Sequence, residues 1–252
     1  MKENTKYFTV PIGMLKGLIS GERDMMECAS DIIDYSLYYH AVRLPFTSEC
    51  NEITTQLKAS AEFFNVRLPS IEAVLRSGKA LYEKYHRKGA YCGVNTEIVW
   101  QYHDSPKTPY QIAQFCAFCA TRSIIGKGEY KKTNRDLITA RMFGYTNKEE
   151  MQNNIPNLAV KNISKKIRVR EKEIEERNKY QTRYHSDKIL TDLELNWGLK
   201  RYADHIRGMY ISYSMDLTEL AKICEQSKKS VRLDALKEAK RLARLSAKST
   251  AP

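Results

Sequence analysis

Along the first ninety residues, apolar side chains recur three and four positions apart, which is the spacing of one face of an α-helix. Pro45 and Pro69 interrupt this stripe, and a helix usually ends before a proline. Ahead of it, Tyr7–Pro11 predicts a short extended segment, and Pro11 opens a helix that ends near Gly17 or Gly21. The stripe itself predicts a helix at 22–43, a second that runs through Ile53 and Phe64 and stops before Pro69, and a third that Ser70 opens and Gly89 closes. A shorter helix is expected around Ile98–Tyr102.

The most apolar stretch of the chain, Tyr110–Ile125, follows a linker with two prolines at Ser105–Pro109. We expect this stretch to form a buried central helix. Residues 134–143 predict a shorter helix that Gly144 ends, and another helix is expected to begin near Asn147. The region 190–245 is expected to hold three or four helices, broken near Ser212–Met215. The pattern therefore continues as helix into the second half of the chain.

The segment 158–181 is dense in charge and has only a thin apolar stripe. We favour an exposed helix there, and the alternation at Ile167–Val169 leaves a strand open. Glycine (11) and proline (7) are sparse, which suits long helices better than a turn-rich sandwich. We therefore expect a mostly α, multi-helical fold, with an N-terminal helical domain over 1–105 and a basic helical region over 106–252.

The positive charge of the chain is concentrated in its second half. Residues 1–126 contain 14 lysines and arginines against 13 acidic residues, whereas residues 127–252 contain 28 against 17. The formal net charge of +12 therefore comes almost entirely from residues 127–252. Such a distribution is expected for a surface that meets a polyanion, and an ordinary solvated basic surface is the alternative.

The composition argues against a membrane, secreted or metal-binding protein. The first thirty residues contain no uninterrupted apolar run, and no stretch is apolar enough to span a bilayer, so we expect a cytoplasmic protein without a membrane partner. Six cysteines in an intracellular chain are expected to be reduced. Cys116 and Cys119 have metal-ligand spacing only once, so we predict neither a metal site nor a cofactor.

The segment 216–233 resembles the helix-turn-helix superfamily of DNA-binding proteins. In that pattern a first helix carries a small residue where the two helices cross, here Ala221, and an apolar residue three positions later, here Cys224. A turn, a serine cap at Ser227 and an inward Val231 on the second helix follow. Glu225 and Gln226 stand where the turn usually has glycine and an apolar residue.

The resemblance implies a recognition helix that begins at Ser227. Its first turns would present polar and basic side chains to phosphates and base edges, with Arg232 able to reach a base. The DNA-binding residues implied in this helix are Ser227, Lys228, Lys229, Ser230 and Arg232. An ordinary helical hairpin, with the same cap and apolar spacing, is the alternative.

A second segment, 133–148, resembles the same superfamily over its first helix and turn. The matching residues are Ala140, Phe143, Gly144, Tyr145 and Thr146, the last as cap. The second helix fits poorly, because its inward position falls on Glu150, with Met151 one residue later. A glycine-terminated core helix with solvated charges explains the segment equally well. The basic residues around it that we list as candidate DNA contacts are Lys131, Lys132, Arg135, Arg141 and Lys148.

No catalytic constellation stands out, so we do not expect an enzyme. His205-Ile-Arg207 has one residue between histidine and arginine, where tyrosine recombinases have two, and no full catalytic set can be assigned. Phosphate-binding loops, Ser/His/Asp arrangements and paired-carboxylate motifs are absent from the sequence. A nuclease or recombinase therefore ranks below the other interpretations.

The sequence predicts a protein that binds double-stranded DNA with a preference for some sequences, as a regulator or an accessory factor in replication or of a mobile element. A homodimer is compatible with this interpretation. The alternative is a structural or interaction protein of a phage or mobile element whose basic face binds a protein partner. RNA is less expected, because the aromatic stacking motifs of the common RNA-binding modules are absent.

Overall fold

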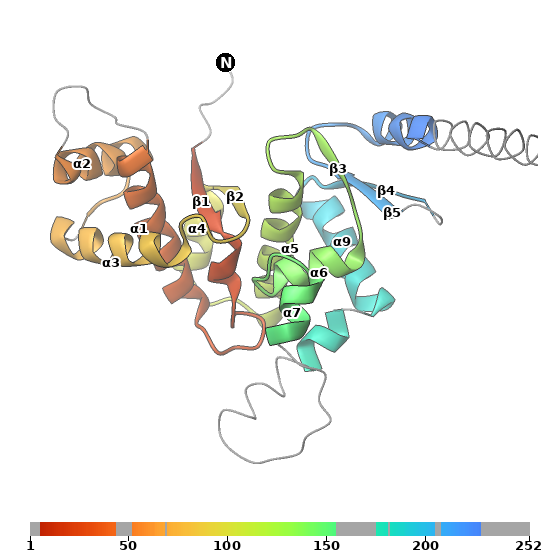
Figure 1. The fold of residues 1–252 in the computed structure, drawn as a ribbon, viewed down its shortest axis with the longest axis horizontal. Coiled ribbons are helices and arrows are strands. Elements are labelled where there is room, and N and C mark those ends of the chain that lie inside the picture. The colour runs from red at the N-terminus through yellow and green to blue at the C-terminus, as the bar shows by residue number, and fades with distance from the viewer. Residues whose placement is uncertain are drawn as a thin grey trace, which may run out of the picture.

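The computed structural model describes residues 6–43, 52–68, 70–154, 175–180, 182–204 and 208–227. Within these ranges the chain is mostly helical and carries two small antiparallel sheets (Figure 1). The prediction of a mostly α, multi-helical fold is confirmed. Among the described residues, no helix combines the length and apolar character needed to cross a membrane.

The N-terminal half is a group of helices around α1, beside a two-stranded sheet. Its elements are β1 (Tyr7–Pro11), the 3-10 helix η1 (Ile12–Leu15), α1 (Met25–Arg43), α2 (Ile53–Phe64), α3 (Ile71–Tyr85), β2 (Tyr91–Asn95) and α4 (Thr96–His103). Helix α1 contacts α2, α3 and α4, and β1 pairs antiparallel with β2. The three long helices lie where the apolar stripe predicts them. The helix expected after Pro11 is only the short η1, and strand β2 was not predicted.

The C-terminal half combines helices with a three-stranded sheet. Its elements are α5 (Pro109–Ile125), β3 (Tyr130–Thr133), α6 (Arg135–Met142), α7 (Lys148–Asn154), α9 (Arg183–Asn196), β4 (Lys200–Asp204) and β5 (Gly208–Ser212). Residues 175–180 and 217–227 are also helical. Thr108 starts α5 with a capping box closed by Gln111, and Pro109 occupies the first turn, where its missing N–H costs nothing.

The three-stranded sheet has the order β3-β5-β4, with both pairs antiparallel. Arg201 on β4 reaches α9 with its side chain, so α9 lies over one face of the sheet. On the other face, Tyr210 forms a small apolar cluster with Leu220 and Cys224 of helix 217–227. The sheet is therefore packed between helices, with β4 at one edge and β3 at the other.

The prediction of helices throughout 190–245 is wrong at Lys200–Ser212, which forms the β4–β5 hairpin. Tyr210 and Ile211, adjacent in sequence, pack into different apolar clusters on opposite faces, as side chains alternate along a strand. Most of the predicted helix at 158–181 lies outside the described residues, and its last described part, 175–180, is helical.

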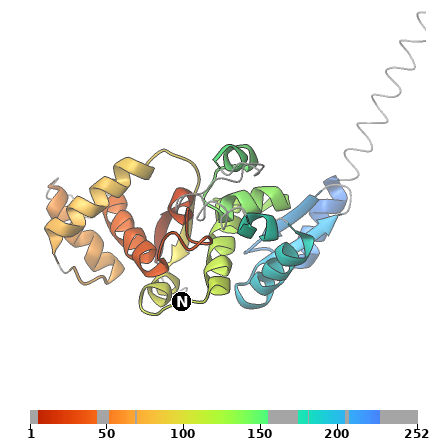
Figure 2. The same cartoon turned by 90° about the horizontal axis from the view of Figure 1, so that it is seen from below.

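One apolar core joins the two predicted regions. It contains Phe8 and Leu37 from the first region and Phe115, Ile138 and Leu193 from the second. Helix α5 lies between the N-terminal helices and the three-stranded sheet (Figure 2) and contacts both β2 and α9. The linker at Ser105–Pro109 therefore does not separate two independent cores.

Candidate nucleic-acid interface

Helices α6 and α7 follow one another across a short turn within the second segment singled out in the sequence, 133–148. Gly144 lies in the turn with a φ of 82°, a conformation that glycine adopts without strain. The N–H of Tyr145 donates to the Ala140 carbonyl, and the Tyr145 side chain is buried. Asn147 caps α7, because its Oδ1 accepts from the Glu150 N–H at 2.8 Å.

The position of this cap explains why the second helix fitted poorly in sequence. The cap is Asn147, one residue later than the predicted Thr146, so the inward position also moves one residue along. Met151 is fully buried, while Glu150 turns back and accepts from the Thr146 N–H at 2.8 Å. The turn between α6 and α7 is therefore one residue longer than the sequence pattern predicts.

The start of α7 is a poor place for a polyanion. Its first turn holds Glu149 and Glu150. Partial burial acts to raise the pKa of Glu150, but hydrogen bonds from Thr146 and the charge of Lys16 outweigh it and lower this pKa below its usual range. Lys16 of the N-terminal half lies 3.5 Å from the Glu150 carboxylate and 4.3 Å from the Tyr145 ring centroid. The N-terminal half therefore contacts this end of the helix through Lys16.

Helix α9 presents to solvent a polar face that carries both cationic and acidic side chains. Thr182 caps it, since its Oγ1 accepts from the His185 N–H at 3.4 Å. Its buried side is formed by Ser186, Ile189, Leu190 and Leu193, at helical spacing. Its exposed side chains include Arg183, Tyr184, Lys188 and Thr191. The Arg183 side chain is 81% exposed and Tyr184 is 71% exposed, so both are accessible to a ligand.

The β4–β5 hairpin follows α9 after a short connection through Gly198, whose φ is 74°. Arg201 on β4 fixes the hairpin to the helix, because its Nε lies 2.9 Å from Glu194 and its Nη1 lies 3.2 Å from Asp187. The Arg201 side chain is 18% exposed. Helix and hairpin are thus held together by charge-assisted hydrogen bonds.

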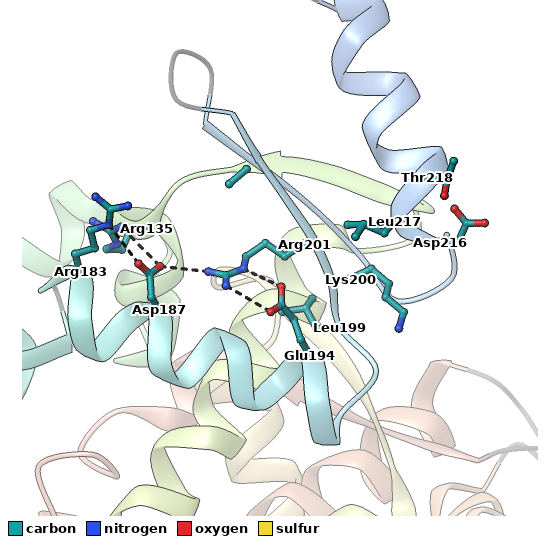
Figure 3. Close-up of a pocket in the computed structure, with 11 residues that line it drawn as sticks. Arg135, Arg183, Asp187, Glu194, Leu199, Lys200, Arg201, Asp216, Leu217 and Thr218 are labelled. Atoms are coloured by element: carbon teal, nitrogen blue, oxygen red, sulfur yellow. Dashed lines mark hydrogen bonds and ion pairs between the residues drawn. The ribbon is translucent and has the colours of Figure 1, made fainter.

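A groove of about 1130 Å³ runs along β4, at the free edge of the sheet, between α9 and the start of helix 217–227 (Figure 3). Four cationic side chains line it: Arg135, Arg183, Lys200 and Arg201. Three carboxylates, Asp187, Glu194 and Asp216, also line it. The groove therefore brings basic side chains from α6, α9 and β4 to one place, with a formal excess of one positive charge.

The basic residues predicted around 133–148 do not form one surface. Lys131 and Lys132 are exposed on β3, at the sheet edge opposite the groove. Lys148 lies 2.8 Å from Asp136, and Arg135 lines the groove. Arg141 points into the turn, where its Nε donates to the Thr146 carbonyl at 2.7 Å and its Nη1 to Ser123 at 3.2 Å. The Arg141 side chain thus stabilises the turn and is not directed to solvent.

The turn predicted at Glu225-Gln226 is wrong. Residues 217–227 form one continuous helix, so Ser227 does not start a new helix. Asp216 starts this helix, its Oδ1 accepting from the Glu219 N–H at 2.8 Å. The small and apolar spacing of a first helix in the motif also suits a helix lying on a sheet, which is how Leu220 and Cys224 are used. The rest of the implied recognition helix, Lys228, Lys229, Ser230, Val231 and Arg232, lies outside the described residues.

Sequence reasoning missed the residues of α9 and β4 that line the groove. The signal for α9 was present: apolar residues at 189, 190 and 193 follow a threonine cap, with Arg183 and Lys188 on other sides of the helix. No local pattern indicated Arg201, because its partners come from a preceding helix. Its role depends on the hairpin, which was expected to be helical.

The cysteines of the described residues are free and buried. Burial raises the pKa of Cys28 to about 12 and that of Cys116 and Cys119 well above the usual value, so these thiols are neutral. Within the described ranges, no three His, Cys, Asp or Glu side chains are grouped so that they could hold a metal ion. Comparisons with protein-family models, curated proteins and solved structures find no match to this chain.

Proposed function

We propose that this protein binds double-stranded DNA with the face formed by α9, the start of α6 and the β4–β5 hairpin. The observation that carries the proposal is a groove lined by arginines from three elements, bordered by the exposed Arg183 and Lys188 of α9. This interpretation replaces 216–233 by α9 as the DNA-contacting helix.

The dimensions and side chains of α9 suit the major groove of DNA. That groove is about 12 Å wide and accepts one α-helix. Arg183 and Lys188 supply charge for phosphates, while Tyr184 and Thr191 supply hydroxyl groups for phosphates or base edges. Lys200, exposed on β4, would contact the flanking backbone. Phosphate contacts then provide most of the affinity, and the face of α9 provides the preference for sequence.

The test compares the double variant Arg183→Ala/Lys188→Ala with a matched control, Lys58→Ala/Lys79→Ala, on duplexes obtained by binding-site selection. The control removes the same charge from exposed positions on α2 and α3. We expect the α9 variant to bind at least about ten-fold more weakly and to lower the salt-dependence slope by about two. Equal losses in both variants would show that only total charge matters.

The rival interpretation is a basic protein that binds an acidic protein partner. Competition with a generic polyanion distinguishes it from a protein that recognises DNA. In this competition the protein is bound to labelled selected duplex. DNA recognition is supported if unlabelled selected duplex displaces the probe at lower concentration than either heparin or random duplex does. If heparin competes as well as every duplex and selection yields no preferred sequence, the proposal fails.

A further inference from the structure

We propose that Asp187 occupies the position of a DNA phosphate within a three-arginine site, and that a phosphodiester of bound DNA replaces it as the partner of Arg135 and Arg183. This inference rests on the proposed function and names one contact with the DNA. In that contact, the guanidinium groups of arginines that line the groove bind one backbone phosphate. Asp187 then limits the affinity of the face for duplex DNA.

The geometry points to one shared counter-ion for three cations. The Asp187 carboxylate lies 3.2 Å from Arg201 Nη1, 3.5 Å from Arg183 Nε and 3.8 Å from Arg135 Nη2. The three arginines come from β4, α9 and α6, and their side chains converge on Asp187 (Figure 3). Guanidinium groups that converge in this way form the usual recognition site for carboxylate or phosphate oxygens.

The three arginines differ in how firmly they are held. Arg201 is mostly buried and also bonds Glu194, so it has a second carboxylate and stays in place. For Arg135 and Arg183, Asp187 is the ion-pair partner given by the described residues, at distances longer than a hydrogen bond. Their side chains are 39% and 81% exposed, and Asp187 is 41% exposed. Exposed pairs of this kind are weak, so a phosphate from solvent can take them over.

Replacing Asp187 by a phosphate places two negative charges near each other in the complex. Binding must overcome this repulsion, which is strongest at low salt, where screening is weakest. Asp187→Asn removes the repulsion and keeps the size of the side chain. The variant should therefore bind random duplex more tightly than the wild type, roughly three- to ten-fold at low salt, with a slope steeper by about one.

The experiment measures duplex affinity by fluorescence anisotropy across a salt series for the wild type, Asp187→Asn and Glu62→Gln. Glu62→Gln removes one exposed carboxylate on α2 and should change the affinity less than two-fold, since it lies in the N-terminal half. Adding Arg183→Ala to Asp187→Asn should abolish the gain, which also checks that the gain comes from this site.

The outcomes separate the two proposals. If the wild type binds DNA but Asp187→Asn binds equally or more weakly, Asp187 is not a phosphate stand-in, and the proposed function survives. If Glu62→Gln gives the same gain, the effect is one of total charge and the inference fails. If the wild type binds no duplex at any salt concentration, the proposed function itself is refuted, and the inference with it.

Discussion

At the scale of single residues, Gly144 leaves no room for a side chain. A Cβ at this position would lie 2.6 Å from Lys16 Cγ and 2.7 Å from the Lys16 backbone nitrogen. The glycine therefore has two roles. It adopts the positive φ of the turn between α6 and α7, and it lets the backbone of the N-terminal half approach this turn. The sequence indicated the first role through the glycine at a helix end, but the second depends on a segment more than a hundred residues away.

Gly144→Ala is expected to destabilise the fold by more than a positive φ alone would. Gly198 provides the control, because its φ is 74° and a Cβ there would meet nothing within 4 Å. Gly198→Ala should cost about 1–2 kcal/mol of unfolding free energy for the positive φ. Gly144→Ala should cost at least about 1 kcal/mol more, because backbone atoms must move. Urea unfolding measures both, and equal losses would contradict the close packing.

At the scale of elements, the long helices were predictable, whereas among the strands only β1 was expected, as the extended segment Tyr7–Pro11. Each long helix of the N-terminal half carries a stripe of apolar residues that only helical spacing explains. The strands are four or five residues long, too short for a clear alternation, and β3 reads Tyr-Lys-Lys-Thr with a single buried residue. The free edge of β4, and with it the groove, could not be foreseen without the hairpin. The α6–α7 pair was indicated, except for the one-residue shift of its cap.

Helix 217–227 is expected to be fixed to the sheet by its buried residues. Leu220→Asp places a carboxylate against Tyr210 in a fully buried position and should lower the unfolding free energy by roughly 3 kcal/mol or more. Lys222→Asp, two residues along on the exposed side, should change it by about 0.5 kcal/mol or less. Thermal and urea unfolding distinguish the two, and equal stability of both variants would show that this helix does not pack on the sheet.

At the scale of the whole molecule, the positive charge is confined to one half of the chain, but the apolar core is not. The formal charge separates at about residue 126, whereas the apolar core runs through both halves by way of α5. The charge distribution predicted a polyanion partner but not the surface that would bind it. That position depends on which cations stay exposed: Arg141 is drawn into the turn, while Arg183 remains accessible. A charge count cannot make this distinction, because it depends on the folded contacts.

The most direct test of the account is hydrogen exchange of the full chain with and without duplex DNA that carries a selected site. We predict slower exchange in α9, around residues 183–191, and in β4, and unchanged exchange in α2 and α3. Helix α7 should also be unchanged, since its first turn carries Glu149 and Glu150. Protection confined to α7 or to the N-terminal helices, with none in α9, would contradict the account.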